Sequence, residues 1–234
     1  MAITTIGLDG DDTLWHSESH FAVTTTRLVD LLDPWVAHTD SAEQHLLDVE
    51  RRNLGLLGYG VKAFTLSMVE TAIEISDGEV PASAIREILD WGKELLDHPV
   101  DLLDEVAETV DGLMGRYQLV LITKGDLFHQ ESKLARSGLA EAFTAVEIVS
   151  EKDVATFERI LGRHQVDGDE FVMVGNSMRS DVLPVLELGS RAVHVPYHVT
   201  WALEVAESDV EVPTLRSLAE LPDLIDSWDS QPSG

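Results

Sequence analysis

Three aspartates stand within four positions at the end of the first apolar run of the chain. The stretch is IGLDGDDTLW, residues 6–15, and Asp9 and Asp11 lie two positions apart in it. In an extended backbone such residues point to the same side, so the two carboxylates would face one small volume. Their repulsion is costly unless a cation lies between them or one of them stays protonated. A divalent cation with oxygen ligands, Mg²⁺ by preference, is the simplest remedy.

Two carboxylates at one site can carry out chemistry in two steps. One can act as a nucleophile while the other gives and takes protons, which is the combination that makes and hydrolyses an aspartyl-phosphate. The alternative is a solvated acidic turn, which is how we interpret Asp12. Because 43 of the 234 residues are Asp or Glu, a D-x-D-x-T string is a weak motif alone, and its context must decide.

Composition limits the classes of function. A net charge of −27 argues against nucleic acid and anionic membrane surfaces as partners, since both require clustered Lys and Arg. The same charge would repel a phosphorylated substrate unless local cations reverse the field, and it is also typical of a high-salt habitat. The chain contains no cysteine, and we find no signal-peptide pattern and no apolar run long enough to span a bilayer. We therefore expect a cytoplasmic protein; its oligomeric state is not readable.

Short apolar runs alternate with helical patterns over most of the chain. The runs are residues 3–8, 119–123, 145–150, 171–176 and 191–196, and the helical patterns between them cover about 126–137, 153–165 and 179–188. This alternation predicts an α/β fold with a Rossmann-like, doubly wound parallel sheet. Ligands of such sheets bind beyond the carboxyl ends of the strands, where the polar residues Asp9, Thr123 and Asn176 fall.

The segment from residue 16 to residue 97 differs, because it has helical periodicity and no good strand pattern. We predict about four helices there, forming a helical cap domain inserted into an α/β core of residues 1–15 and 98–234. An insertion at the active-site edge is typical of a lid that closes over a substrate.

The acidic string and three later strand ends resemble, in order and spacing, the motifs of the haloacid dehalogenase-like hydrolase superfamily. GLDGDDTLW is similar to its first motif, LVLITKG to its second, SEKD to the lysine of its third, and VMVGNSMRSD to its acidic fourth. The resemblance spans essentially the whole chain, and the helical insertion follows the first motif as in the phosphatase-type members with a cap.

The resemblance implies a role for each matching residue. Asp9 would be the nucleophile and Asp11 the acid and base, Thr123 would bind a phosphoryl oxygen, and Lys152 would balance charge. Mg²⁺ would be the cofactor, held by Asp9, Asp11, Asn176 and Asp181. A small phosphorylated molecule would be the substrate, and its phosphoryl group would lie near Thr13, Lys124, Gly125 and Arg179.

One position departs from the family pattern. The residue after the glycine of the fourth motif is usually acidic, whereas this chain has Asn176. An amide oxygen can bind Mg²⁺ but carries no charge, so this change affects metal affinity or the choice of ligands. The scarce lysines support a phosphate site nonetheless, because two of the five, Lys124 and Lys152, fall at the predicted strand ends.

Several functions fit this pattern. A phosphatase is the first; a 2-haloacid dehalogenase is the second, although it has no use for a metal or for a proton shuttle at Asp11. A phosphomutase would use the same residues as a phosphatase. A non-catalytic phospho-receiver-like module is the alternative from another class, but it would carry its aspartate on a middle strand.

Overall fold

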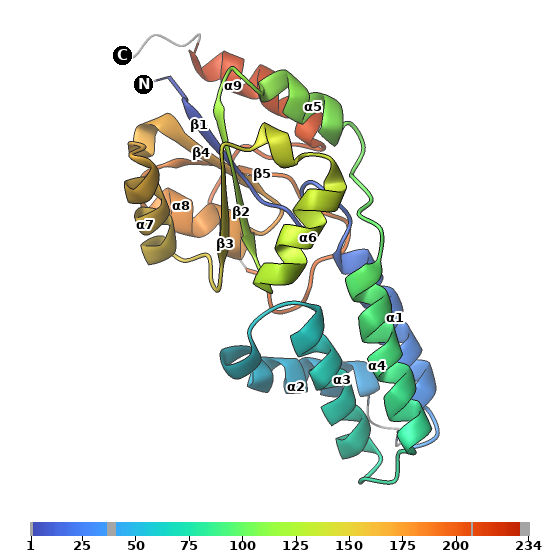
Figure 1. Cartoon of the computed structure of the whole chain (residues 1–234). Helices are drawn as coiled ribbons and strands as arrows, with labels where there is room; N and C mark the ends of the chain where they lie inside the picture. The colour runs from blue at the N-terminus through green and yellow to red at the C-terminus, as the bar shows by residue number, and fades with distance from the viewer. Residues whose placement is uncertain (1, 37–40, 207, 230–234) are drawn as a thin grey trace. The chain divides into compact units, whose positions relative to one another are not determined.

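The computed structural model describes residues 2–36, 41–206 and 208–229 of the chain. In these residues five parallel strands form one sheet (Figure 1). The strands are β1 (Thr5–Leu8), β2 (Gln118–Lys124), β3 (Ala145–Val149), β4 (Phe171–Gly175) and β5 (Arg191–His194). Their order is β3-β2-β1-β4-β5, so β1 lies between β2 and β4. The predicted α/β fold with a doubly wound parallel sheet is confirmed.

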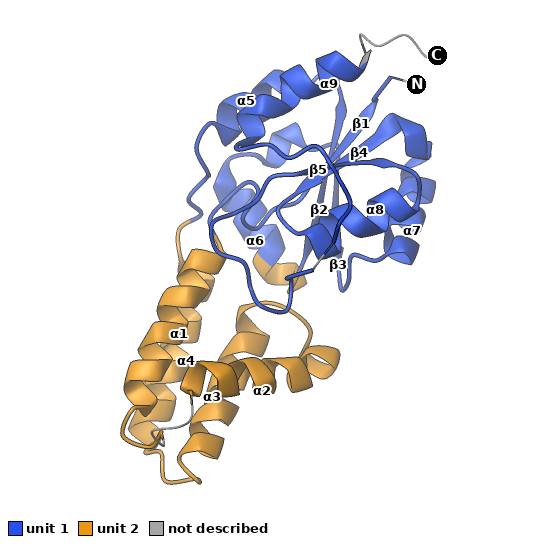
Figure 2. Ribbon diagram, turned by 180° about the vertical axis from the view of Figure 1, so that it is seen from behind, with its two compact units in different colours: residues 1–16, 100–124, 130–234 blue, residues 17–99, 125–129 orange. Residues whose placement is uncertain are grey.

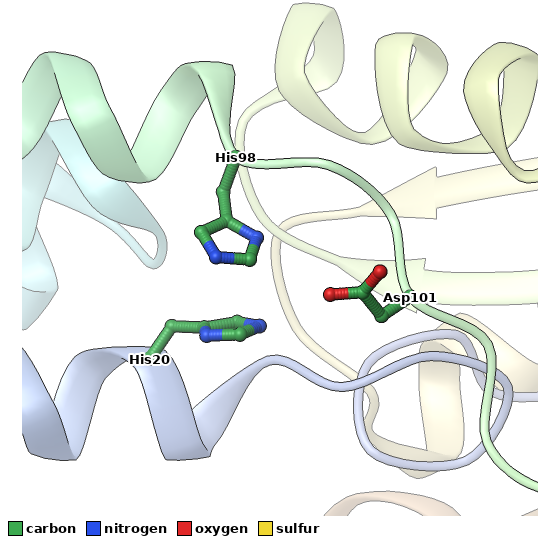
Figure 3. Close-up of side chains that lie close together, drawn as sticks. All are labelled: His20, His98 and Asp101. Atoms are coloured by element: carbon green, nitrogen blue, oxygen red, sulfur yellow. The ribbon is translucent and has the colours of Figure 1, made fainter.

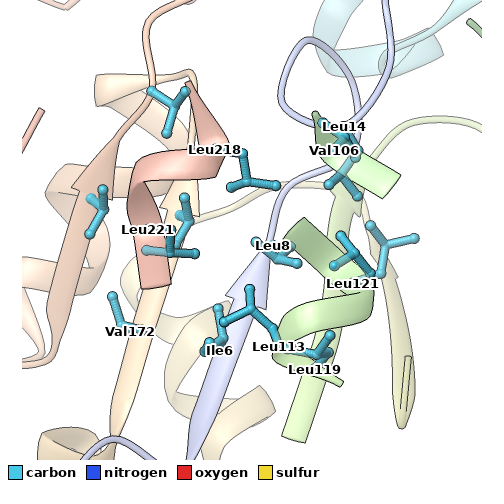
Figure 4. Close-up of a cluster of buried hydrophobic side chains, with 14 of the residues drawn as sticks. Ile6, Leu8, Leu14, Val106, Leu113, Leu119, Leu121, Val172, Leu218 and Leu221 are labelled. Carbon is cyan, nitrogen blue, oxygen red and sulfur yellow. The ribbon is translucent and has the colours of Figure 1, made fainter. Parts of the chain in front are cut away.

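Helices cover both faces of this sheet, and the alternation of side chains along the strands explains why. Leu119 and Leu121 of β2 pack in a cluster with residues of α5 and α9, whereas Val120 and Ile122 pack on the opposite face against α7 and α8. Figure 4 shows the first cluster. The helices are α5 (Val106–Leu113), α6 (Leu127–Ser137), α7 (Val154–His164), α8 (Leu183–Glu187) and α9 (Leu221–Asp229).

The chain divides into two compact units, which Figure 2 colours separately. Unit 1 comprises residues 1–16, 100–124 and 130–234 and contains the sheet; unit 2 comprises residues 17–99 and 125–129. Unit 2 contains α1 (Glu18–Leu32), α2 (Ala42–Leu57), α3 (Val61–Ile75) and α4 (Ala82–Asp97), which match the helical periodicity of the sequence. Leu28, Leu46, Met68 and Ile88 lie at the centre of its apolar core.

The helix expected at residues 179–188 is interrupted. A π-helical turn, Met178–Val182, precedes α8, and the amides of Asp181 and Val182 both donate to the carbonyl of Ser177, at 2.8 and 3.3 Å. Pro184 in the first turn of α8 has no N–H to donate to a preceding carbonyl, so a regular helix cannot run through it.

No helix in the described residues is both long and apolar enough to cross a membrane.

Candidate active site

The carboxyl ends of the strands bring the predicted site residues to one edge of the sheet. Asp9 follows β1 directly, Thr123 and Lys124 end β2, and Asn176 follows β4. Because β1 lies between β2 and β4, Asp9 is at the centre of this edge. Lys152 follows β3 and is placed by the next residue, Asp153, whose carboxylate caps α7 by accepting the amide of Thr156 at 2.8 Å.

Lys152 links two of the predicted acidic residues. Its Nζ lies 2.5 Å from Oδ1 of Asp9 and 2.6 Å from Oδ1 of Asp181. All three side chains are buried, with 2% of Lys152 and 1% of Asp181 exposed. A buried charge is tolerated only when it is paired, so each of these groups depends on the others.

The cluster shifts the pKa of its members. Burial raises the pKa of Asp9 to about 7, and Asp181 adds to this effect by repulsion while Lys152 opposes it. Burial acts to lower the pKa of Lys152, but attraction to Asp181 and Asp9 outweighs it and raises that pKa. One ammonium thus serves two carboxylates, and Asp9 retains a strong tendency to gain a proton or a further cation.

The tight loop after β1 holds Asp9 from its other side. Thr13 donates to Oδ2 of Asp9 at 3.1 Å and lies 3.5 Å from Oδ1 of Asn176. The loop closes through the amide of Leu14, which donates to the carbonyl of Gly10 at 2.8 Å. Asp12 has a left-handed backbone with φ of 62°, a conformation that aspartate adopts more readily than most residues. Asp12 is therefore a turn residue of this loop, but the expected solvated position is wrong, because the tight loop buries it and leaves only 7% exposed.

Asp11 has a separate set of partners. Lys133 Nζ and Trp15 Nε1 donate to its Oδ1 at 2.7 and 2.6 Å, and Gln130 Nε2 donates to its Oδ2 at 3.0 Å. Burial acts to raise the pKa of Asp11, but Lys133 and these hydrogen bonds lower it overall. The repulsion expected between Asp9 and Asp11 is thus met by two different lysines.

Lys133 and Gln130 were not expected from the sequence. They lie three residues apart on α6, on one face of the helix that follows β2. Gln130 also donates to Oγ1 of Thr123 at 3.2 Å and to the carbonyl of Lys124 at 2.6 Å, so it joins the second motif to Asp11. The signal that could have found Lys133 is the scarcity of lysine, since three of the five lysines contact this edge.

The fourth motif is held in a tight turn. The amide of Ser177 donates to Oδ2 of Asp181 at 3.0 Å, and Nε2 of His194 lies 3.0 Å from the carbonyl oxygen of Asn176. Gly175 allows this approach, because a Cβ there would lie 2.2 Å from Oδ2 of Asp181. The glycine before Asn176 is thus required by the position of Asp181.

Two of the remaining predicted substrate contacts, Lys124 and Arg179, have partners within the protein. Lys124 donates to Ser180 at 2.8 Å and pairs with Glu204. Arg179 donates to the carbonyl of Leu203 at 2.6 Å. Gly125, which belongs to unit 2, has φ of 129°, a region that glycine alone adopts easily.

The donor set fits a hard cation. Carboxylate oxygens of Asp9 and Asp181, the amide oxygen of Asn176 and the backbone carbonyl of Asp11 are the oxygen ligands that Mg²⁺ takes. The chain has no cysteine, so no thiolate is available as a ligand at this edge. The raised pKa of Asp9 also indicates that the negative charge at this edge is not fully balanced by cations of the chain.

Several cationic side chains of unit 2 form ion pairs at its surface. Arg52 pairs with Glu70 at 3.2 Å and Glu74 at 2.7 Å, and Lys62 pairs with Asp126 at 2.9 Å. In the same unit the ring centroids of His20 and His98 lie 3.8 Å apart, and the rings are tilted by 35° to each other. Figure 3 draws them with Asp101, which belongs to unit 1.

A parallel α/β sheet with acidic and basic side chains at the carboxyl ends of its strands places the protein in the Rossmann-like class, with its ligand site at that edge. Comparison with known proteins then gives the family: a model described as haloacid dehalogenase-like hydrolase matches residues 3–189. The chain belongs to the haloacid dehalogenase-like hydrolase family, which confirms the resemblance seen in the sequence.

Solved structures agree. A haloacid dehalogenase-like family hydrolase from Xanthomonas campestris is 41% identical, with a TM-score of 0.86 over 98% of this chain and 93% of that one. A 2-haloacid dehalogenase from Pseudomonas syringae is 22% identical (TM-score 0.63; 97% and 99% covered). A predicted phosphoglycolate phosphatase from Haemophilus somnus is 19% identical (TM-score 0.66; 95% and 97%). The last two show likeness of fold alone. No curated protein matches the chain.

Proposed function

We propose that this hydrolase is a Mg²⁺-dependent phosphatase that cleaves a small phosphorylated metabolite through an aspartyl-phosphate on Asp9. The observation that carries the proposal is the division of the two neighbouring carboxylates between two environments. Asp9 has a raised pKa and lies with Lys152, whereas Asp11 has a lowered pKa and lies with Lys133. Two neighbouring carboxylates that are held by different lysines can take different roles, one in nucleophilic attack and the other in proton transfer.

In the first step an oxygen of Asp9 attacks phosphorus and the bond from phosphorus to the leaving alcohol breaks. The alcohol takes its proton from Asp11, whose pKa rises when a phosphoryl dianion lies beside it, because like charges disfavour ionisation. Lys152 offsets the negative charge shared by Asp9 and the phosphoryl group, and Thr123 donates to a phosphoryl oxygen. Mg²⁺, held by Asp9, Asp181, Asn176 and the Asp11 carbonyl, would supply further positive charge to the same oxygens.

In the second step water attacks the phosphorus of the aspartyl-phosphate. Asp11, now ionised, accepts the proton of that water, and the bond between Asp9 and phosphorus breaks to give inorganic phosphate. The ion pair with Lys133 favours the ionised form of Asp11 that this step requires.

Side chains beside the reaction centre, together with unit 2, would select the substrate. Thr13, Gly125 and Arg179 would lie near the phosphoryl group, Lys124 would bind another anionic part of the substrate, and the helical unit would act as the cap. The partner is a small molecule, and the protein is cytoplasmic.

Hydrolysis of p-nitrophenyl phosphate tests the proposal. We expect turnover with Mg²⁺, loss of turnover in excess chelator with recovery when Mg²⁺ is restored, and at least about a hundredfold loss in Asp9→Asn, because the amide is a poor nucleophile. Full activity in chelator or in Asp9→Asn would contradict it.

Dehalogenation is a second candidate that one observation favours. Lys152 alone pairs with both Asp9 and Asp181, and Asn176 brings no charge to the fourth motif, so the site is partly neutralised by the chain itself. Asp9 would then attack the halogen-bearing carbon of a 2-haloacid. Bromide release from 2-bromopropionate in the presence of chelator would favour this function over the phosphatase.

A further inference from the structure

A glutamate from an irregular segment reaches the same edge of the sheet. Glu204 lies beyond β5, in a turn where its amide donates to the carbonyl of Trp201 at 2.9 Å. Its Oε1 pairs with Lys124, and its Oε2 accepts from Ser177 at 2.7 Å and from Ser180 at 2.5 Å. Both carboxylate oxygens are therefore bound by donors from elsewhere in unit 1.

These donors form a built anion site rather than a surface ion pair. Only 12% of Lys124 and 15% of Glu204 are exposed, and Lys124 also donates to Ser180 at 2.8 Å. Although burial acts to raise the pKa of Glu204, Lys124 and the two serines lower it. The arrangement of one ammonium and two hydroxyls matches a planar group with two oxygens.

Each donor is adjacent in the chain to a residue of the catalytic edge. Lys124 follows Thr123, Ser177 follows Asn176, and Ser180 precedes Asp181. The backbone on both sides is fixed by β2, β4 and the π-helical turn. The donors therefore keep their place beside the reaction centre whatever carboxylate they bind.

Glu204 itself is on the least regular part of the site. Between β5 and the short helical turn at Leu218–Glu220 the described chain has no helix or strand. Tyr197, whose hydroxyl lies 2.6 Å from Nδ1 of His16, and Leu215, whose amide donates to the carbonyl of His194 at 2.9 Å, hold the segment towards its ends. Near Glu204 the segment is held by the contact from Arg179 to the carbonyl of Leu203. A segment with few backbone hydrogen bonds opens at a lower free-energy cost than a helix or strand, so its carboxylate can be exchanged.

We propose that Lys124, Ser177 and Ser180 form a subsite for a carboxylate of the substrate, which the chain's own Glu204 occupies and the substrate displaces. The inference rests on the proposed function, and it narrows the substrate class to phosphate monoesters that also carry a carboxylate. The subsite gives Lys124 a role: it attracts the second anionic group of a substrate that the net charge of −27 would otherwise repel.

Two matched phosphonates test the subsite. 2-Carboxyethylphosphonate carries both groups, and propylphosphonate replaces its carboxylate by a methyl group. Dissociation constants for both are measured by calorimetry with Mg²⁺ in the wild type, Glu204→Gln, Lys124→Met and the control Glu151→Gln. Glu151 also contacts Lys124, at 3.5 Å, but it is 48% exposed. It therefore reports the effect of removing one charge near this lysine.

In Glu204→Gln we expect 2-carboxyethylphosphonate to bind about tenfold more tightly, the size of one charge-assisted hydrogen bond, and propylphosphonate to change less than about twofold. Lys124→Met should lose the preference for the carboxylate, and Glu151→Gln should leave it within about twofold of the wild type.

An equal change for both phosphonates in Glu204→Gln, or no binding of 2-carboxyethylphosphonate to that variant, would overturn the subsite. If propylphosphonate binds without any preference for the carboxylate, the phosphoryl site stands and the subsite fails. If 2-carboxyethylphosphonate gains from Glu204→Gln while p-nitrophenyl phosphate is not hydrolysed, the subsite stands and the phosphatase fails.

Discussion

Asp9 and Asp11 are two positions apart, yet their carboxylates belong to different networks. Asp9 shares Lys152 with Asp181, whereas Asp11 accepts from Lys133, Trp15 and Gln130. This division gives each of the neighbouring carboxylates its own lysine, although burial still raises the pKa of Asp9 to about 7. Lys152 therefore affects Asp9 and Asp181, whereas Lys133 affects Asp11, so the two lysines can be tested separately.

Replacing Lys133 by Met should lower the free energy of unfolding at pH 7 by about 1–3 kcal/mol, because Asp11 keeps its charge and loses its cation. The folded-state pKa of Asp11 lies below its ordinary value, so its contribution is present above that ordinary value and is lost as the pH falls through the lowered pKa. Urea unfolding of both proteins from pH 7 downward should therefore show a difference that shrinks with acidification.

Lys93→Met is the control for this measurement, since Lys93 pairs with Asp90 at 2.6 Å but is 65% exposed. It should change the free energy of unfolding by less than about 0.5 kcal/mol. A pH-independent loss in Lys133→Met would show that the lysine contributes packing rather than charge.

Replacing Lys152 by Met removes the only positive charge that the described structure places between Asp9 and Asp181. The loss of an ammonium from a buried cluster costs about 3–5 kcal/mol. We expect Mg²⁺ to raise the midpoint of thermal unfolding more in this variant than in the wild type, because the two carboxylates then lack any other cation. Equal Mg²⁺ shifts in both proteins would place the cation elsewhere.

At the scale of elements, the sheet edge positions the site through close approaches that few residues permit. Gly175 ends β4 where Asp181 folds back on it, with Cγ of Asp181 only 2.3 Å from the position of an added Cβ. The π-helical turn that follows supplies this return of the chain. The position of Asp181 in the site therefore depends on the glycine that ends β4.

Gly175→Ala should displace Asp181 and weaken Mg²⁺ binding by about tenfold or more, as the loss of a ligand position does. Gly162→Ala is the matched control, because an added Cβ on this residue of α7 meets nothing within 4 Å. That variant should gain about 0.5–1 kcal/mol of stability from helix propensity and keep its Mg²⁺ affinity. Calorimetric titration with Mg²⁺ checks both, and unchanged affinity in Gly175→Ala would contradict the role of Asp181.

Hydrophobic periodicity predicted the strands, most helices and their α/β arrangement, because burial on a parallel sheet imposes that pattern. The residues at strand ends, Asp9, Thr123 and Asn176, followed from the same reasoning. Lys133 and Gln130 did not, since their contact with Asp11 depends on how α6 packs. Glu204 could not be predicted either, because its segment has no periodic pattern and its partners are distant in the sequence.

At the scale of the whole molecule, the net charge of −27 is the dominant property. Self-repulsion of this size opposes the compact state, and dissolved salt screens it over about 10 Å at 0.1 M. The lysines at the site therefore have to attract an anionic substrate against the repulsion of the whole chain.

Raising KCl from 0.05 to 0.5 M should therefore raise the temperature of unfolding at pH 7. The same change near the isoelectric point of about 4.4 should have little effect, since the net charge there is close to zero. Scanning calorimetry at the two pH values makes the comparison. A salt response that is equal at both would attribute the stabilisation to something other than charge repulsion.

The central claim is that Asp9 carries the phosphoryl group during turnover. Rapid acid quenching of the enzyme with Mg²⁺ and p-nitrophenyl phosphate, followed by peptide mass spectrometry, tests it directly. The account predicts a phosphoryl adduct on Asp9 that is absent in Asp9→Asn and in chelator. Turnover with no adduct on Asp9, or with the adduct on another residue, would contradict it.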